Sequence, residues 1–305
     1  MAIKNLPKEE LLFRGTGACP GCMASLSTRI VLKALGKKTI LVIPASCTAS
    51  IEGFYPNTPY NIPVLTMAFE AAAAAASGVS AALERLGEND TNVVVWAGDG
   101  GTYDIGLQAL SGAVERGTNF IYICYNNESY SNTGIQRSGA TPYGAWTTTT
   151  WAGKTEQRKD VPAIMRAHDV AYLATASPSY AEDLFRKVRR AKSIKGSKYI
   201  EIHSPCSPAW RFPMDKTIEV GRLAVQTGAW ALYEYENGKL TFSGRSKLIL
   251  EREVEPEPIE DYLKVQGRFS HLFEPSRDEE RLNEIKRRLE WDWDRFRKEV
   301  ACEIG

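Results

Sequence analysis

Two short polar motifs carry oxygen donors suited to a cation. Asp99 lies within the run Gly98-Asp99-Gly100-Gly101, and Asn127 ends the pair Asn126-Asn127. Carboxylate and amide oxygens, completed by phosphate oxygens and water, are ligands that suit Mg²⁺. The glycines beside Asp99 would let backbone N–H groups approach an anion closely. The residue types therefore predict a site for a Mg²⁺-diphosphate.

The two motifs follow segments that predict neighbouring strands. Val93 to Ala97 and Phe120 to Tyr125 are apolar runs, and Ile105 to Arg116 between them has helical spacing and ends at Gly117. In such a β-α-β unit the parallel strands place both tips on one edge of the sheet, where α/β proteins bind ligands. We expect Asp99 and Asn127 to lie together there. The alternative is two ordinary turns in an α/β sheet.

Four cysteines form a second chemical group. Cys19 and Cys22 make a CxxC, while Cys47 and Cys206 each lie in a Pro/Ser-rich loop after a predicted strand. Thiolates that converge from loops suit Zn²⁺ or an iron–sulfur cluster, and their spacing alone does not separate these two. A redox dithiol is also possible for a CxxC, although no strand feeds this one. Cys124 lies within a predicted strand and is expected in the core.

The rest of the chain alternates predicted helices and strands. Predicted helices cover Ala24 to Leu35, Phe69 to Leu86, Val161 to His168 and Tyr180 to Ile194; predicted strands cover Thr39 to Ile43, Val170 to Thr175 and Tyr199 to His203. This alternation indicates an α/β fold with a doubly wound, mostly parallel sheet. We assign residues 1–220 to a domain with both candidate sites and residues 221–305 to a C-terminal extension.

The extension and one long loop complete the organisation. Residues 1–18 predict an extended arm, Leu240 to Leu250 a hairpin, 251–260 an acidic, proline-rich linker, and Asp278 to Val300 a docking helix. The loop from Glu128 to Lys154 is polar and begins at the predicted metal site, so we expect it to be functional rather than disordered. Thr147–Thr150 could equally form a short exposed strand.

Composition excludes several classes of protein. The chain has 305 residues, a formal net charge of +1 and no apolar run of transmembrane length. Charge therefore gives no support for binding nucleic acid or a membrane surface. Charged residues interrupt the N-terminus where a signal peptide needs an apolar core, so we expect a cytoplasmic protein. A reducing cytoplasm makes disulfides between the six cysteines unlikely.

Several motifs together resemble a known family. CPGC, SCTAS, the GDG…NN unit, YSNTGIQRSGATPYGAWTTTT, HSPC and QGRFSHL follow the order found in the β subunit of 2-oxoacid:ferredoxin oxidoreductases. The resemblance implies the fold of thiamine-diphosphate enzymes, with thiamine diphosphate, Mg²⁺ and one [4Fe–4S] cluster. It implies cluster ligation by Cys19, Cys22, Cys47 and Cys206 and Mg²⁺ ligation by Asp99, Asn127 and the Ser129 carbonyl. The implied cofactor-binding residues are Cys47, Thr48, Gly98, Asp99, Gly100, Gly101, Asn127, Ser129, Tyr130 and Asn132, with Asn132 near the reacting carbon.

One expected group is missing from this chain. Thiamine diphosphate needs a carboxylate at its aminopyrimidine, and in the resembled family a partner subunit provides it. Glu70 is the local candidate in an apolar context, and we interpret it as structural. The chain is therefore expected to act with other subunits, a 2-oxoacid, ferredoxin and possibly coenzyme A.

The predicted reaction is oxidative decarboxylation of a 2-oxoacid, with pyruvate favoured and oxalate or branched-chain 2-oxoacids as alternatives. Two other hypotheses remain open. In one, the cysteines bind structural zinc in a non-redox lyase component. In the other, the chain is a non-catalytic electron-transfer subunit.

Overall fold

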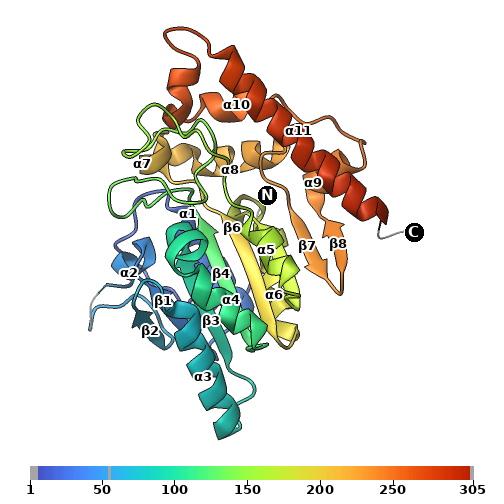
Figure 1. Ribbon diagram of the computed structural model, residues 1–305. Coiled ribbons are helices and arrows are strands. Elements are labelled where there is room, and N and C mark those ends of the chain that lie inside the picture. The colour runs from blue at the N-terminus through green and yellow to red at the C-terminus, as the bar shows by residue number, and fades with distance from the viewer. Residues whose placement is uncertain (1–5, 54–55, 303–305) are drawn as a thin grey trace.

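A mixed sheet of eight strands organises the computed structural model, which describes residues 6–53 and 56–302. The strand order is β2-β1-β3-β4-β6-β5-β7-β8 (Figure 1). The strands are β1 (Thr39–Pro44), β2 (Val64–Met67), β3 (Asn92–Gly98), β4 (Phe120–Asn126), β5 (Tyr172–Ala176), β6 (Ser197–His203), β7 (Tyr233–Glu236) and β8 (Lys239–Phe242). The first six are parallel to their neighbours, and β7 and β8 add an antiparallel edge. The predicted α/β fold with a mostly parallel sheet is confirmed.

Register explains why the two polar motifs meet. Gly98, at the end of β3, pairs with Tyr125 near the end of β4, and Asn126 pairs with His203 at the end of β6. The strands β3, β4 and β6 therefore finish level with one another. Asp99 and Asn127, one residue beyond these ends, are brought to the same edge of the sheet, as the β-α-β pattern predicted.

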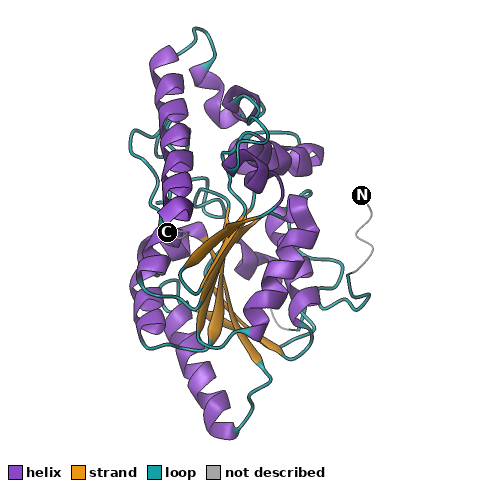
Figure 2. Ribbon diagram, turned by 90° about the vertical axis from the view of Figure 1, so that its right-hand side faces the viewer, coloured by secondary structure: helices purple, strands orange, loops and turns teal. Residues whose placement is uncertain are grey.

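Helices cover both faces of the sheet (Figure 2). One face packs against α1 (Met23–Leu35) and α6 (Ala181–Ser193). The other packs against α3 (Ala72–Leu86), α4 (Leu107–Glu115), α5 (Val161–Ala167) and the end of α11 (Glu279–Cys302). Alternate residues of β1, β3, β4, β5 and β6 enter one core or the other, as expected for strands buried on both sides.

A third layer caps the carboxyl ends of the strands (Figure 1). Its elements are α7 (Ser207–Trp210), α8 (Thr217–Gln226), α10 (Ile259–Lys264), the 3₁₀-helix η4 (Gly267–Leu272) and the first half of α11. They share a core built around Trp210, Trp230 and Phe269, all nearly fully buried. The layer places residues from beyond position 205 above the polar motifs.

Several boundaries differ from the sequence predictions. The hairpin predicted over Leu240 to Leu250 is at the wrong position. The observed hairpin joins β7 and β8 through Asn237-Gly238, both at positive φ. Most of the predicted range forms the helix α9 (Gly244–Leu250) instead. An Asn-Gly pair between alternating residues is a strong hairpin signal, and the prediction overlooked it. The strand β2 and the helix α8 were also missed. Thr147 and Thr150 form only an isolated bridge.

The two ends of the described chain are held differently. Within the predicted N-terminal arm, Leu11 and Leu12 are buried and Leu12 forms a bridge with Tyr60, while residues 1–5 lie outside the described part. The predicted tail helix is α11, whose Leu282, Trp293 and Phe296 are buried against this chain. None of the helices in residues 6–53 and 56–302 combines the length and apolar character needed to cross a bilayer.

Candidate functional site

The Asp99 carboxylate lies buried at the end of β3. It is 1% exposed, its Oδ1 accepts a hydrogen bond from the Asn127 backbone N–H at 3.2 Å, and its Oδ2 accepts one from the Ser138 hydroxyl at 2.5 Å. Burial raises the pKa of Asp99 to about 7, although the hydrogen bonds from Ser138 and Asn127 act to lower it. A buried carboxylate of this kind requires a nearby positive charge to stay ionised at neutral pH.

Three oxygen atoms face one another beside Asp99. The Asn127 side-chain oxygen lies 2.7 Å from the Ser129 carbonyl oxygen and 2.9 Å from Asp99 Oδ1. Without a cation these acceptors would repel, and turning the amide so that its nitrogen faces them would relieve the contact. Neighbouring ligands of an octahedral Mg²⁺, with bonds of 2.0–2.1 Å, stand about 2.9 Å apart. These positions suit a magnesium site when the amide oxygen faces Asp99, and a cation-free turn with hydrogen bonds to Asp99 and Ser129 when the amide nitrogen does.

The glycines around Asp99 allow aromatic side chains to pack closely against the backbone. A Cβ at Gly100 would lie 2.4 Å from the ring of Tyr130, and one at Gly101 would lie 3.0 Å from the ring of Phe69. A Cβ at Gly98 would lie 3.3 Å from the Tyr125 hydroxyl oxygen. The structure thus gives these three glycines a packing role that the sequence reasoning, which assigned them to anion approach, did not foresee.

A helix begins earlier than the periodicity indicated. Asp99 has right-handed helical φ and ψ and is followed directly by the π-helix η1 (Gly100–Ile105), which leads through Gly106 into α4. A Cβ at Gly106 would lie 2.2 Å from the Gly101 carbonyl oxygen. The wider π turn therefore needs glycine at this point, and π turns occur frequently at functional sites.

Residues from two later segments hold the turn that contains Asn127. The Trp210 indole N–H donates to the Asn127 backbone carbonyl at 2.8 Å, and Arg268 forms an ion pair of 2.6 Å with Glu128, which has φ of 60°. The Arg268 guanidinium also lies 3.7 Å from the centre of the Trp210 ring. The sequence analysis did not single out Trp210, Arg268 or Ser138. The QGRFSHL motif, which contains Arg268, was the available signal.

The remaining predicted cofactor residues surround the same edge. Thr48 is buried, with its hydroxyl accepting a hydrogen bond from Trp96 at 3.1 Å. Tyr130 lies against Gly100 and donates to Asp104 at 2.8 Å. Asn132 accepts from the Ser50 hydroxyl at 3.3 Å and is exposed. The loop from Glu128 to Lys154 is ordered around these contacts, and Lys154 reaches back to the Thr141 carbonyl at 2.7 Å.

The four loop cysteines lie near one another. Burial, followed by the charges of Cys206, Cys22, Asp99 and Cys19, raises the pKa of Cys47 to about 12. Cys22 and Cys206 precede α1 and α7, and Cys47 begins α2 (Cys47–Glu52). All four are free thiols. The cysteine group therefore adjoins Asp99, and the two candidate sites are neighbours.

Four thiolates can build two kinds of metal site. A tetrahedral Zn²⁺ with bonds near 2.3 Å brings its sulfurs to about 3.8 Å from one another. A [4Fe–4S] cluster binds each thiolate through a different iron, which spreads the four sulfurs further apart. Among the described residues, no group of three or more His, Cys, Asp or Glu side chains is placed to hold one metal ion.

Two other cysteines and one glutamate complete the set considered from the sequence. Cys124 is fully buried in the core of β4, as predicted. Cys302 is exposed at the end of α11. Glu70 is exposed just before α3 and has no hydrogen bond or ion pair with another described residue.

Comparison with known proteins identifies the family. Residues 46–202 match the family described as thiamine pyrophosphate enzyme, C-terminal TPP binding domain. The chain is 52% identical to pyruvate synthase subunit PorB of Methanothermobacter thermautotrophicus over 88% of this chain and 93% of that protein. It is 48% identical to ketoisovalerate oxidoreductase subunit VorB of Pyrococcus abyssi over 96% of this chain and 94% of the other.

This chain belongs to the PorB/VorB family of 2-oxoacid:ferredoxin oxidoreductase subunits. A solved structure supports the fold: 2-oxoglutarate:ferredoxin oxidoreductase from Magnetococcus marinus matches with a TM-score of 0.58 at 21% identity, over 72% of this chain and 81% of that one. Membership of the family means that the chain binds thiamine diphosphate as an oxidoreductase subunit that acts with partner subunits.

The packing of Tyr130 over Gly100 leads to a first prediction. Gly100→Ala should displace the Tyr130 ring and the turn that follows Asn127, lowering the free energy of unfolding by about 1–3 kcal/mol. Gly78→Ala is the matched control, because Gly78 lies in α3 with open space around it and alanine favours a helix by about 0.5–1 kcal/mol. Chemical denaturation of both variants provides the measurement. A Gly100→Ala protein as stable as Gly78→Ala would contradict the packing role.

Proposed function

We propose that this subunit holds thiamine diphosphate through Mg²⁺, carries one [4Fe–4S] cluster beside it, and serves oxidative decarboxylation of pyruvate with transfer of electrons to ferredoxin. The observation that carries the proposal is the meeting of the buried Asp99 carboxylate with the turn that contains Asn127 at the level ends of β3 and β4. The neighbouring cysteine group adds a second chemistry at the same edge of the sheet.

In this proposal different residues of the chain bind the metal ion and the separate parts of the cofactor. The Asp99 carboxylate, the Asn127 amide oxygen and the Ser129 carbonyl hold Mg²⁺. Thr48 and the Gly98 to Gly101 turn lie toward the diphosphate, and Tyr130 braces that turn through Gly100. Asn132, exposed beside α2, faces the reacting end of the cofactor. Thiamine diphosphate, when bound, supplies a nucleophilic carbon and an electron sink for decarboxylation.

We assign the cluster to Cys19, Cys22, Cys47 and Cys206. Support comes from the proximity of the other three thiols to Cys47 and from membership of a ferredoxin oxidoreductase family. A [4Fe–4S] cluster accepts and passes on single electrons, which suits ferredoxin as the acceptor. Structural zinc in a non-redox component is the alternative, and it would not pass electrons to ferredoxin. Six free cysteines also suit a reducing cytoplasm.

The active site is proposed to be completed by a partner subunit. Glu70 is exposed and forms no hydrogen bond or ion pair with another described residue. We therefore expect another chain to provide the carboxylate that contacts the aminopyrimidine of the cofactor. Of the helix α3, only Ala72, Ala73 and Ala76 are buried, which leaves a face of small residues free for docking. We propose residues 1–220 as the domain with both cofactor sites and 221–305 as an extension whose α11 also docks. Coenzyme A, if used, would enter at this interface.

A branched-chain 2-oxoacid is the second candidate substrate. The similarity to a ketoisovalerate oxidoreductase subunit, 48% over nearly the whole chain, favours it specifically. The relative named pyruvate synthase is 52% identical over a shorter part. Pyruvate is therefore proposed first, with 2-ketoisovalerate next and oxalate after it.

The metal assignment predicts a charge effect. Asp99→Asn keeps the size of the side chain and an oxygen for the Asn127 N–H but removes the negative charge, so affinity for Mg²⁺ and thiamine diphosphate should fall at least about tenfold. Calorimetric titration of the assembled enzyme, stripped of cofactor, measures this. Asp90→Asn, in an exposed ion pair, is the control. Unchanged affinity in Asp99→Asn would overturn the magnesium assignment.

The cluster assignment predicts a difference between cysteines. Cys47→Ser should lower iron and acid-labile sulfide per chain, because serine is a poorer iron ligand than a thiolate. Cys124→Ser, in the core, and Cys302→Ser, on the surface, should retain full iron content. Elemental analysis and the visible absorption of the anaerobically purified enzyme provide the measurement. Equal iron in all three variants would contradict the four-cysteine assignment, and bound zinc would favour the alternative.

The proposed function is tested with the assembled enzyme and a panel of 2-oxoacids. Pyruvate should be oxidised with ferredoxin as acceptor at a higher kcat/KM than 2-ketoisovalerate or oxalate. This chain alone should show no activity, since the active site is proposed to need a partner. Preference for 2-ketoisovalerate would move the assignment to the second candidate. Full activity from the isolated chain would overturn the interface proposal.

A further inference from the structure

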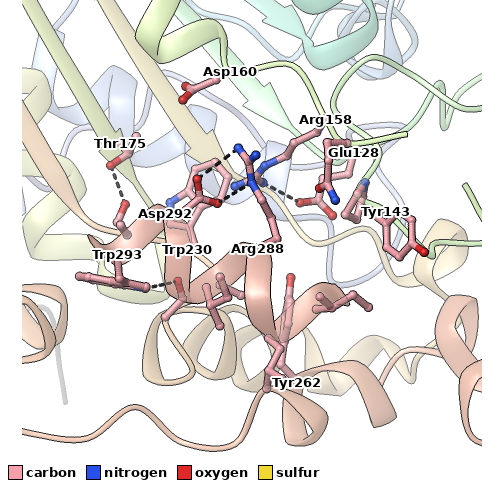
Figure 3. Close-up of a pocket in the computed structure, with 18 of the residues that line it drawn as sticks. Glu128, Tyr143, Arg158, Asp160, Thr175, Trp230, Tyr262, Arg288, Asp292 and Trp293 are labelled. Atoms are coloured by element: carbon pink, nitrogen blue, oxygen red, sulfur yellow. Dashed lines mark hydrogen bonds and ion pairs between the residues drawn. The ribbon is translucent and has the colours of Figure 1, made fainter. Parts of the chain in front are cut away.

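A pocket of about 180 Å³ lies beside the cofactor site, between the ends of β5 and β6 and the helix α11 (Figure 3). Its apolar wall comes from the capping layer and includes Ile259, Leu263 and Leu289. None of the residues that line it is a candidate magnesium or cysteine ligand. The pocket is therefore separate from the groups assigned to the cofactors.

One cation on the wall, the Arg158 guanidinium, makes a single long ion pair and is 36% exposed. Arg158 forms no hydrogen bond with another described residue, and its ion-pair contact is with Glu128 Oε1 at 3.5 Å. Glu128 is already neutralised by the shorter contact of 2.6 Å with Arg268 through its other oxygen. Arg158 is thus the second and more distant cation at Glu128, and the carboxylates of Glu201 and Asp292 also lie in its surroundings. Figure 3 shows Glu128, Arg158, Arg288 and Asp292 gathered at one side of the pocket.

The other cations around the pocket are engaged. Arg288 pairs with Asp292 at 3.2 Å, Arg295 with Asp160 at 2.8 Å, and Lys159 with Asp104 at 2.7 Å. Each has a carboxylate at hydrogen-bond or close ion-pair distance. Arg158 therefore stands out as the guanidinium available to a guest.

A second, independent donor lies in the same wall. Trp230 is 4% exposed, and its indole Nε1 has no hydrogen-bond partner among the described residues. A buried N–H without an acceptor costs about 1–3 kcal/mol, so native structures rarely leave one unpaired. The Arg158 guanidinium lies 5.8 Å from the centre of the Trp230 ring. Both residues line the same pocket.

We propose that this pocket binds a small organic monocarboxylate, with its carboxylate between Arg158 and the Trp230 N–H and its hydrocarbon part against Ile259, Leu263 and Leu289. A planar guanidinium fork suits the two oxygens of a carboxylate. A cavity of about 150 Å³ holds benzene, so this pocket suits a guest of about six to nine non-hydrogen atoms. The apolar wall favours an organic acid over inorganic phosphate.

Benzoate is the probe, because it combines a ring of the right size with one carboxylate. Calorimetric titration of the assembled enzyme, with its cofactors in place, should show saturable binding of one benzoate for each copy of this chain. Arg158→Gln should weaken binding at least about tenfold, and Trp230→Phe, which keeps the ring but loses the N–H, about threefold to tenfold. Thermal unfolding of each variant shows whether it is folded.

Three controls test the chemistry of the site. Arg190→Gln, which alters an exposed arginine paired with Glu236 on β7, should leave benzoate affinity unchanged. Benzamide, the neutral analogue, should bind at least about tenfold more weakly than benzoate. Inorganic phosphate should not compete. The proposal is overturned if wild-type enzyme shows no saturable benzoate binding, if both pocket variants bind as wild type, or if phosphate displaces benzoate at equal concentration.

Discussion

The buried Asp99 carboxylate at the end of β3 is the feature on which this edge of the sheet depends. It is 1% exposed and accepts hydrogen bonds from the Asn127 backbone N–H and the Ser138 hydroxyl. A buried carboxylate is costly unless it is hydrogen-bonded or paired with a positive charge. Asp99 therefore depends on the turn that contains Asn127, and the level ends of β3 and β4 bring that turn to it.

Later parts of the chain return to brace this edge. Trp210 holds the Asn127 carbonyl, Arg268 holds Glu128 at its left-handed φ, and Ser138 holds Asp99. Each contact joins segments far apart in sequence, so the capping layer positions the site as well as closing the core. The same layer forms part of the wall of the pocket that contains Arg158. Glu128 and Arg268, which hold the turn, also line that pocket.

The site is rigid on one side and open on the other. Asp99 and Asn127 lie at the ends of buried strands, whereas Asn132 and Glu70 are exposed and α3 buries little of its surface. A dry, preorganised environment is what makes charge development in an active site favourable. An edge of this kind therefore becomes a complete active site when a second chain covers it, in keeping with a family of subunits.

The sequence by itself determined the α/β class and the meeting of Asp99 with Asn127, because apolar periodicity and β-α-β connectivity are local signals with a defined geometric consequence. It also pointed to the cysteine group through motif order. Only the tertiary structure decided that Gly100 makes room for Tyr130 and that Trp210 and Arg268 brace the turn. These roles arise from contacts between distant segments, and no periodicity or spacing within one segment encodes which distant side chain will arrive there.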